Sequence, residues 1–145
     1  MSQTHLTIPN LKELGGGVWT AGQPSRENLE QAKDAGFNSV ITLCPQGECG
    51  WDEKTVVEQL GMRYSCIPIS SGGDLSEASA RALHVELESS PRPVLVHCGS
   101  ANRVGALFAL KAHFVDGHPP ETALDHGRRA GLVGLEAAVR QILRS

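Results

Sequence analysis

Short apolar runs alternate along this sequence with longer segments in which apolar residues recur at every third or fourth position. The short runs predict β-strands at residues 17–22, 38–43, 63–69 and 92–97. The longer segments predict α-helices at residues 24–36, 52–61, 72–90, 103–117, 120–131 and 135–144. Strands that alternate with helices of this length usually lie parallel to one another in a single sheet. We therefore predict an α/β fold with a mostly parallel sheet of four to five strands flanked by helices.

Local signals support several of these helix boundaries. Ser25 stands where a hydroxyl can cap the first predicted helix, and Gly36 and Gly61 stand where the first two helices should end. The segment 72–90 opens with a capping signal in which Asp74, followed by Glu77, is a candidate N-cap.

Length and charge narrow the class of protein. The 145 residues contain no repeat and no linker-like stretch, so we expect one domain over residues 1–145. The formal net charge of -3 argues against a nucleic-acid partner, which requires a basic surface. No apolar run is long enough for a membrane span, and the N-terminus lacks the features of an export signal. We expect a cytoplasmic protein without a membrane partner, and its oligomeric state stays open.

The four cysteines are Cys44, Cys49, Cys66 and Cys98. Without an export signal a disulfide framework is not expected, and their spacing matches no zinc site, so we predict neither a metal nor a cofactor. Cys66 lies inside an apolar strand and is expected in the core. Cys44 lies at the end of its strand, where it could approach Cys98 and form a protective disulfide under oxidation.

The segment "VLVHCGSANRVGALFAL" (94–110) is the most informative part of the chain. A predicted strand ends at His97, four residues separate Cys98 from Arg103, and a predicted helix follows. The first backbone amides of a helix have no partner within it, and the helix dipole adds positive potential, so such a junction can hold an oxyanion. Ligands of parallel sheets bind at this edge. The sequence therefore predicts an anion-binding loop that contains a thiol.

Each residue of the loop fits this role. The predicted phosphate-binding residues are Gly99, Ser100, Ala101, Asn102 and Arg103. The first three are small enough for the backbone to wrap an anion, and Gly99 and Asn102 are the residues expected to tolerate a left-handed backbone. Arg103 can direct two N–H groups to a tetrahedral oxyanion, and its charge favours the Cys98 thiolate. The alternative is an inert core thiol beside a surface arginine, which the helix dipole disfavours.

The segment "HCGSANRVGALFAL", preceded by "PVLV", resembles the active-site segment of the cysteine phosphatases. The closest resemblance is to the bacterial beta-lactamase-hydrolase-like phosphatase family, atypical relatives of the dual-specificity phosphatases. "VWTAGQPSRENLEQAKDAGFNSVITL", "GMRYSCIPI" and "ALDHGRRAGLVGLEAAVR" are similar to other parts of that family, so the resemblance spans about 18–140. The short Cys-x4-Arg loop is itself typical of the family.

The resemblance implies a phosphatase that acts on phosphotyrosine, phosphoserine-type or aryl phosphomonoesters, in a phosphorylated protein or a small phosphoester. Cys98 would accept the phosphoryl group and Arg103 would clamp its oxygens. His97 would orient the loop or tune the thiolate, unless it is a purely structural histidine. Val104 replaces the usual Ser or Thr after the arginine. Breakdown of the cysteinyl-phosphate would then be slow unless Ser100 or Asn102 supplied a hydrogen bond.

The proton donor for the leaving group is less clear in the sequence. Relatives carry an aspartate on the loop after the third strand, which makes Asp74 the catalytic candidate here, against its alternative as a helix cap. Asp52 and Glu48 are weaker candidates.

Two other functions compete with phosphate hydrolysis. Rhodanese-like sulfurtransferases carry a cysteine in a six-residue loop, the length of "CGSANR", and would use a Cys98 persulfide. The histidine before Cys98 and the N-terminal half of the chain favour the phosphatase. A catalytically weak protein that binds phosphorylated partners is the third possibility, because of Val104 and the uncertain acid.

Overall fold

The computed structural model describes residues 7–45, 51–70, 72–99 and 101–144. Within them, five strands form one sheet in the order β1-β2-β5-β3-β4. Their bounds are β1 Lys12–Gly15, β2 Val18–Ala21, β3 Ser39–Thr42, β4 Arg63–Cys66 and β5 Val94–His97. The strands from β2 to β4 are parallel, so the predicted α/β fold with a mostly parallel sheet is confirmed.

Strand β1 was not among the predicted strands. It pairs antiparallel with β2, and its last residue, Gly15, and the two turn residues, Gly16 and Gly17, all have positive φ. Its sequence, KELG, carries two charged residues and lies at the edge of the sheet, half-buried and exposed in alternation. A polar edge strand has too few apolar residues to be recognised from periodicity.

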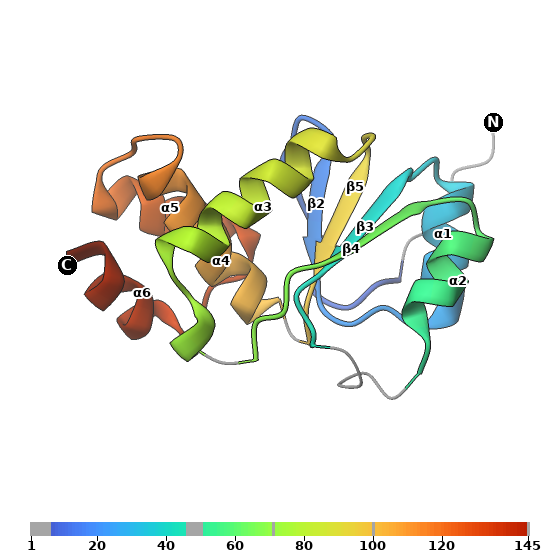
Figure 1. The fold of residues 1–145 in the computed structure, drawn as a ribbon, viewed down its shortest axis with the longest axis horizontal. Helices are drawn as coiled ribbons and strands as arrows, with labels where there is room; N and C mark the ends of the chain where they lie inside the picture. The colour runs from blue at the N-terminus through green and yellow to red at the C-terminus, as the bar shows by residue number, and fades with distance from the viewer. Residues whose placement is uncertain (1–6, 46–50, 71, 100, 145) are drawn as a thin grey trace.

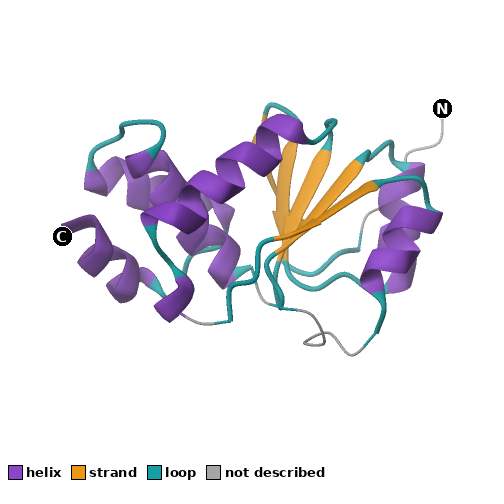
Figure 2. Ribbon diagram, in the orientation of Figure 1, coloured by secondary structure: helices purple, strands orange, loops and turns teal. Residues whose placement is uncertain are grey.

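Helices cover both faces of the sheet, as Figures 1 and 2 show. The described helices are α1 Arg26–Asp34, α2 Glu53–Gln59, the short 3-10 helix η1 Gly72–Asp74, α3 Glu77–Ser89, α4 Asn102–Phe114, α5 Pro120–Ala130 and α6 Glu136–Arg144. In Figure 1 α1 and α2 lie to the right of the sheet and α3 to α6 to its left. No described helix has the length and apolar character that a membrane span needs.

The helix boundaries test the capping signals directly. Ser25 caps α1 and shares a capping box with Asn28, and Gly36 follows the end of that helix at φ +100°, as the sequence predicts. The N-cap of α3 is not Asp74, which the sequence offered as a candidate. Ser76 is the N-cap, and its hydroxyl accepts a hydrogen bond from the backbone N–H of Ser79. Asp74 lies in η1, one turn earlier, so its assignment as a helix cap is wrong.

Strand β5 runs through the centre of the sheet and separates two cores. Val94 and Val96 face the larger core under α3 and α4, whereas Leu95 faces the smaller core under α1 and α2. Successive side chains of a strand point to opposite faces. The same alternation directs His97 toward α2 and Cys98 toward α4.

Cys66 departs from its predicted place in the core. It is the last residue of the edge strand β4, and its side chain is exposed. An apolar run at a sheet edge has no neighbouring strand on one side, and the sequence does not reveal which strand is outermost.

Candidate active site

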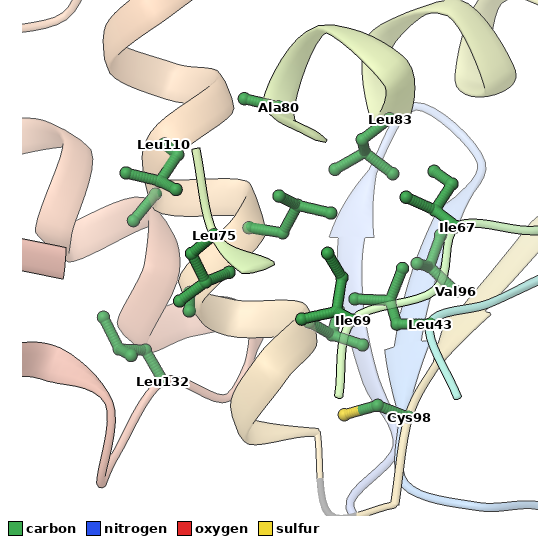
Figure 3. Close-up of a cluster of buried hydrophobic side chains, with 14 of the residues drawn as sticks. Leu43, Ile67, Ile69, Leu75, Ala80, Leu83, Val96, Cys98, Leu110 and Leu132 are labelled. Carbon is green, nitrogen blue, oxygen red and sulfur yellow. The ribbon is translucent and has the colours of Figure 1, made fainter. Parts of the chain in front are cut away.

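Cys98 lies at the carboxyl edge of the sheet, directly after the central strand β5. Its backbone N–H donates to the carbonyl of Ala21 at the end of the neighbouring strand β2, over 3.3 Å. Its side chain is fully buried at the end of the larger core, below Leu43 and Ile69 in the view of Figure 3. The fold thus places the thiol where ligands of parallel sheets bind.

The loop enters α4 through an unusual backbone conformation at Ala101. Ala101 has φ +74°, in the left-handed region, and it is the N-cap of α4 without a side-chain hydrogen bond to the helix. The sequence named Gly99 and Asn102 as the loop residues that tolerate this conformation, whereas the structure places it at Ala101. For a residue with a Cβ the left-handed conformation costs about 1–2 kcal/mol. Gly131 packs directly against Ala101, so closely that a Cβ on the glycine would lie 2.7 Å from the Ala101 carbonyl. This close packing holds the conformation of Ala101.

The absence of a capping side chain at Ala101 matters for anion binding. The first amides of α4 have no acceptor within the helix, and the N-cap supplies none. The positive end of the helix dipole can therefore attract an oxyanion beside Cys98. Ser100, a predicted member of this cradle, lies outside the described residues, so its role stays a prediction.

Arg103 is the second residue of α4, and its guanidinium crosses to the segment after β4. Nη1 donates to the carbonyl of Ile69 over 2.8 Å, and Nη2 lies 3.9 Å from Sγ of Cys44. The arginine is half-buried. The fold therefore gathers Cys98, Arg103 and Cys44 at one edge of the sheet, as the sequence suggested for all three. A Cys44–Cys98 disulfide stays a prediction.

Asn102 and Val104 flank the arginine and serve the packing of α4. The Oδ1 atom of Asn102 accepts hydrogen bonds from the backbone N–H groups of Val133 and Leu135 in the connection between α5 and α6. The oxygen of its carboxamide is thus committed to that connection. Val104 is fully buried in the larger core. Neither side chain supplies a hydroxyl near Cys98.

Asp74 lies on the segment that Arg103 contacts through Ile69. Its Oδ2 accepts a hydrogen bond from the backbone N–H of Ser70 over 2.8 Å, and its side chain is exposed. The carboxyl group is thus carried by a short, exposed turn at the same edge of the sheet as Cys98. Its role as proton donor stays a prediction.

The weaker acid candidates are less suited or not described. Asp52 is the N-cap of α2, and its carboxylate accepts hydrogen bonds from the hydroxyl and the backbone amide of Thr55. These bonds lower the pKa of Asp52, which makes it a poorer proton donor near neutral pH. Glu48 lies outside the described residues.

A buried polar network lies behind the loop, and the sequence did not predict it. Nε2 of His97 lies 2.5 Å from Oε2 of Glu53, the first residue of α2, and both side chains are buried. The other oxygen of Glu53 accepts a hydrogen bond from Nε2 of Gln23 over 3.0 Å. Acidic residues are common in the first turn of a helix, where they are normally exposed, so nothing in the sequence distinguishes Glu53.

Known proteins resemble this chain over most of its length. No protein-family model matches it. The beta-lactamase hydrolase-like protein of Agrobacterium fabrum is 32% identical over 130 residues, which are 86% of this chain. Its counterpart in Xylella fastidiosa is 31% identical over 102 residues, or 67% of this chain. This chain is a homologue of part of the beta-lactamase hydrolase-like proteins. The resemblance predicted from the sequence is thus confirmed.

The homologous region makes up only a fraction of those relatives. The chain spans 30% of the Agrobacterium protein and 23% of the Xylella protein.

Solved structures share the fold at lower sequence identity. A crystallised candidate phosphatase from Neisseria meningitidis superposes with a TM-score of 0.73 at 20% identity, covering 90% of this chain and 94% of its own. TpbA of P. aeruginosa, crystallised in complex with pTyr, gives a TM-score of 0.73 at 17% identity and covers 94% of this chain and 83% of its own. These matches establish a cysteine phosphatase-like fold for this chain.

Proposed function

We propose that this chain is a cysteine-dependent phosphatase that hydrolyses phosphate monoesters through a cysteinyl-phosphate intermediate. The observation that carries the proposal is the junction of β5 and α4, where Cys98, the N-terminus of α4 and Arg103 occupy one edge of the sheet. A thiol in a positive field becomes a nucleophile, and the same field binds the phosphoryl oxygens.

In the first step the Cys98 thiolate attacks the phosphorus atom. An S–P bond forms while the bond from phosphorus to the ester oxygen breaks, and the leaving oxygen takes up a proton. Arg103 exchanges its contact with the Ile69 carbonyl for the phosphoryl oxygens, on which negative charge develops. We assign the proton donor to Asp74, which lies on the turn following that carbonyl.

In the second step water attacks the phosphorus of the cysteinyl-phosphate. A proton of that water passes to the Asp74 carboxylate left by the first step, the S–P bond breaks, inorganic phosphate leaves, and the thiolate is regenerated. The buried Val104 offers no hydrogen bond to the departing thiolate, so we expect this step to limit turnover.

The substrates we propose are phosphotyrosine, phosphoserine-type groups or small aryl phosphomonoesters. Aryl esters should pass through the first step fastest and show the highest kcat/KM, because their leaving oxygens need less protonation than alkoxides. Support for this class comes from the shared fold of a protein crystallised with pTyr.

The test measures two activities on one preparation: hydrolysis of para-nitrophenyl phosphate and transfer of sulfur from thiosulfate to cyanide. We expect phosphate hydrolysis in the parent chain, loss of at least about 10³-fold in Cys98→Ser, and negligible thiocyanate production. Cys66→Ser is the matched control, since that thiol is exposed and outside the loop. Thiocyanate production without phosphatase activity would instead identify a sulfurtransferase, and phosphopeptide binding without either activity would identify a binding protein.

The role of Asp74 has its own test, Asp74→Asn. Asparagine keeps an oxygen that can accept the Ser70 hydrogen bond but cannot donate a catalytic proton. We expect kcat/KM for an alkyl phosphate to fall about 10²-fold, kcat/KM for para-nitrophenyl phosphate to fall much less, and the alkaline limb of the pH–kcat/KM profile to disappear. Asp34→Asn, at an exposed site on α1, serves as control. An equal loss on both substrates would refute the assignment.

A further inference from the structure

Burial of the Glu53–His97 pair lowers the stability of the fold, and the pair has no evident structural purpose. Glu53 is 4% exposed and His97 is fully buried. Removing a carboxylate from water costs on the order of several kcal/mol. Apolar side chains of similar size at such a position usually stabilise a fold at least as well as a buried ion pair does. An acid at the first position of α2 would be favoured by the helix dipole even if it pointed to solvent. Its inward direction therefore calls for another explanation.

Every hydrogen-bonding atom of the Glu53 carboxylate has a partner that belongs to the site. Oε2 faces Nε2 of His97, the residue before Cys98, and Oε1 accepts from Nε2 of Gln23. A carboxylate can only accept, so it fixes the proton of the imidazole on Nε2 and the orientation of the Gln23 amide. The Nδ1 atom of His97 is buried and lacks a partner among the described residues.

Gln23 carries the connection onward to the loop and toward the arginine. Its backbone N–H donates to the carbonyl of Gly99 over 3.1 Å, which ties Gln23 to the residue that follows Cys98. Its Oε1 accepts from Sγ of Cys44 over 3.6 Å, and that sulfur lies beside Nη2 of Arg103. The backbone packs closely here, since a Cβ at Gly22 would lie 3.0 Å from the Gly99 carbonyl.

We propose that Glu53 is a positioning residue of the phosphatase, which acts through His97 and Gln23 to hold Cys98 and its loop ready for the anion. The proposal rests on the proposed function of the site. Glu53 touches neither Cys98 nor Arg103 in any described contact. Glu53 lies on α2, on the opposite face of the sheet from α4. It reaches the loop in two ways: directly through His97, which precedes Cys98, and through Gln23, which is bonded to Gly99.

The principal test is Glu53→Gln, with Glu58→Gln on the exposed face of the same helix as matched control. Glutamine has one acceptor and one donor, so it cannot accept from both His97 and Gln23. We expect kcat for para-nitrophenyl phosphate to fall about tenfold to a hundredfold with little change in KM, because the loop is less well oriented in the transition state. Equal kcat values in the two variants would overturn the proposal.

A second readout does not depend on turnover. Alkylation of Cys98 by iodoacetamide, followed by mass spectrometry of its peptide across a pH series, reports where the thiolate forms. We expect Glu53→Gln to move this profile to higher pH by about half a unit or more, because the loop amides no longer hold the thiolate as well. A shift to lower pH would mean that Glu53 acts only as a nearby negative charge, and it would overturn the proposal.

The double variant Glu53→Gln with Gln23→Glu separates positioning from folding. It exchanges donor and acceptor between the two side chains. The amide oxygen at position 53 accepts from His97, and the amide N–H at position 53 donates to the carboxylate at position 23. That carboxylate also accepts from the Cys44 thiol. We expect kcat to recover to within about threefold of the parent chain. Failure to recover with an unchanged melting temperature would contradict the proposal. If the parent chain hydrolyses no phosphate, the proposed function fails, while the alkylation profile still tests Glu53.

Discussion

Val104 follows Arg103 at a position where a serine or threonine would place a hydroxyl near the thiolate. It is fully buried in the first turn of α4, two positions after Asn102, the first residue of the helix. A thiolate that leaves phosphorus beside Val104 receives no hydrogen bond from that side chain and depends on Arg103 and the rest of the loop. The identity of this one side chain should therefore decide which chemical step limits turnover.

Val104→Thr is expected to accelerate the second step. A hydrogen bond to a charged group contributes about 1.5–3 kcal/mol, which corresponds to roughly tenfold or more in rate. Rapid mixing with para-nitrophenyl phosphate should show a burst of product in the parent chain and a smaller burst with faster steady-state turnover in the variant. Val104→Ala removes bulk without adding a hydroxyl, so a similar acceleration there would contradict this explanation.

At the scale of elements, α3 is tied to strand β4 by a polar cluster. Oε1 of Glu86 accepts a hydrogen bond from the Ser65 hydroxyl over 2.7 Å and pairs with Nη1 of Arg63 over 3.0 Å. The same arginine donates to the hydroxyl of Ser90. The Ser65 hydrogen bond and, less strongly, Arg63 lower the pKa of Glu86. This cluster fixes the edge strand that leads to the turn carrying Asp74.

Glu86→Gln should reveal the pH dependence of this link. A carboxyl whose pKa is lower in the folded chain stabilises the fold above its unfolded pKa, and that contribution is lost as pH falls through the folded value. Because the pair is partly exposed, we expect the variant to lose only about 0.5–1 kcal/mol at pH 7 in urea unfolding. The difference should shrink as pH falls below about 4.3, the ordinary glutamate value. The exposed Glu88→Gln on the same helix should match the parent chain, and a pH-independent difference would argue against the cluster.

At the scale of the whole molecule, α4 and α5 approach each other through glycines. A Cβ on Gly105 would lie 2.1 Å from the backbone nitrogen of Leu132, and a Cβ on Gly127 would lie 2.7 Å from the Cβ of Ala109. This contact seats the connection after α5 beneath the loop, where Gly131 meets Ala101. The left-handed conformation at Ala101 is thus maintained by the assembly of two helices that come later in the chain.

Gly105→Ala should disturb both stability and the site. The added methyl group clashes with backbone, which cannot rotate away as a side chain can, so we expect a loss of about 3 kcal/mol in urea unfolding. Gly134→Ala is the control, because a Cβ there would make an ordinary 3.4 Å contact with the Asn102 amide. Comparable stability of the two variants would show that the helices have room to separate.

Much of the architecture followed from the sequence alone, because it depends on neighbours along the chain. Apolar periodicity predicted the four parallel strands and the helices between them, and Ser25 and Gly36 marked the ends of α1. The placement of Cys98 and Arg103 on either side of a strand-to-helix loop is equally local, since six consecutive residues determine it. These features need no knowledge of distant contacts.

Tertiary structure alone decided the features that depend on which distant segments meet. The polar edge strand β1 is stabilised by pairing with β2, and Cys66 is exposed because β4 is the outermost strand on the other side. Ala101 adopts a conformation that its own side chain disfavours because Gly131 packs against it. Glu53 turns inward because the fold brings it to His97, 44 positions later in the chain. Each outcome reflects packing or hydrogen bonding between residues far apart in sequence, and such interactions override local preference.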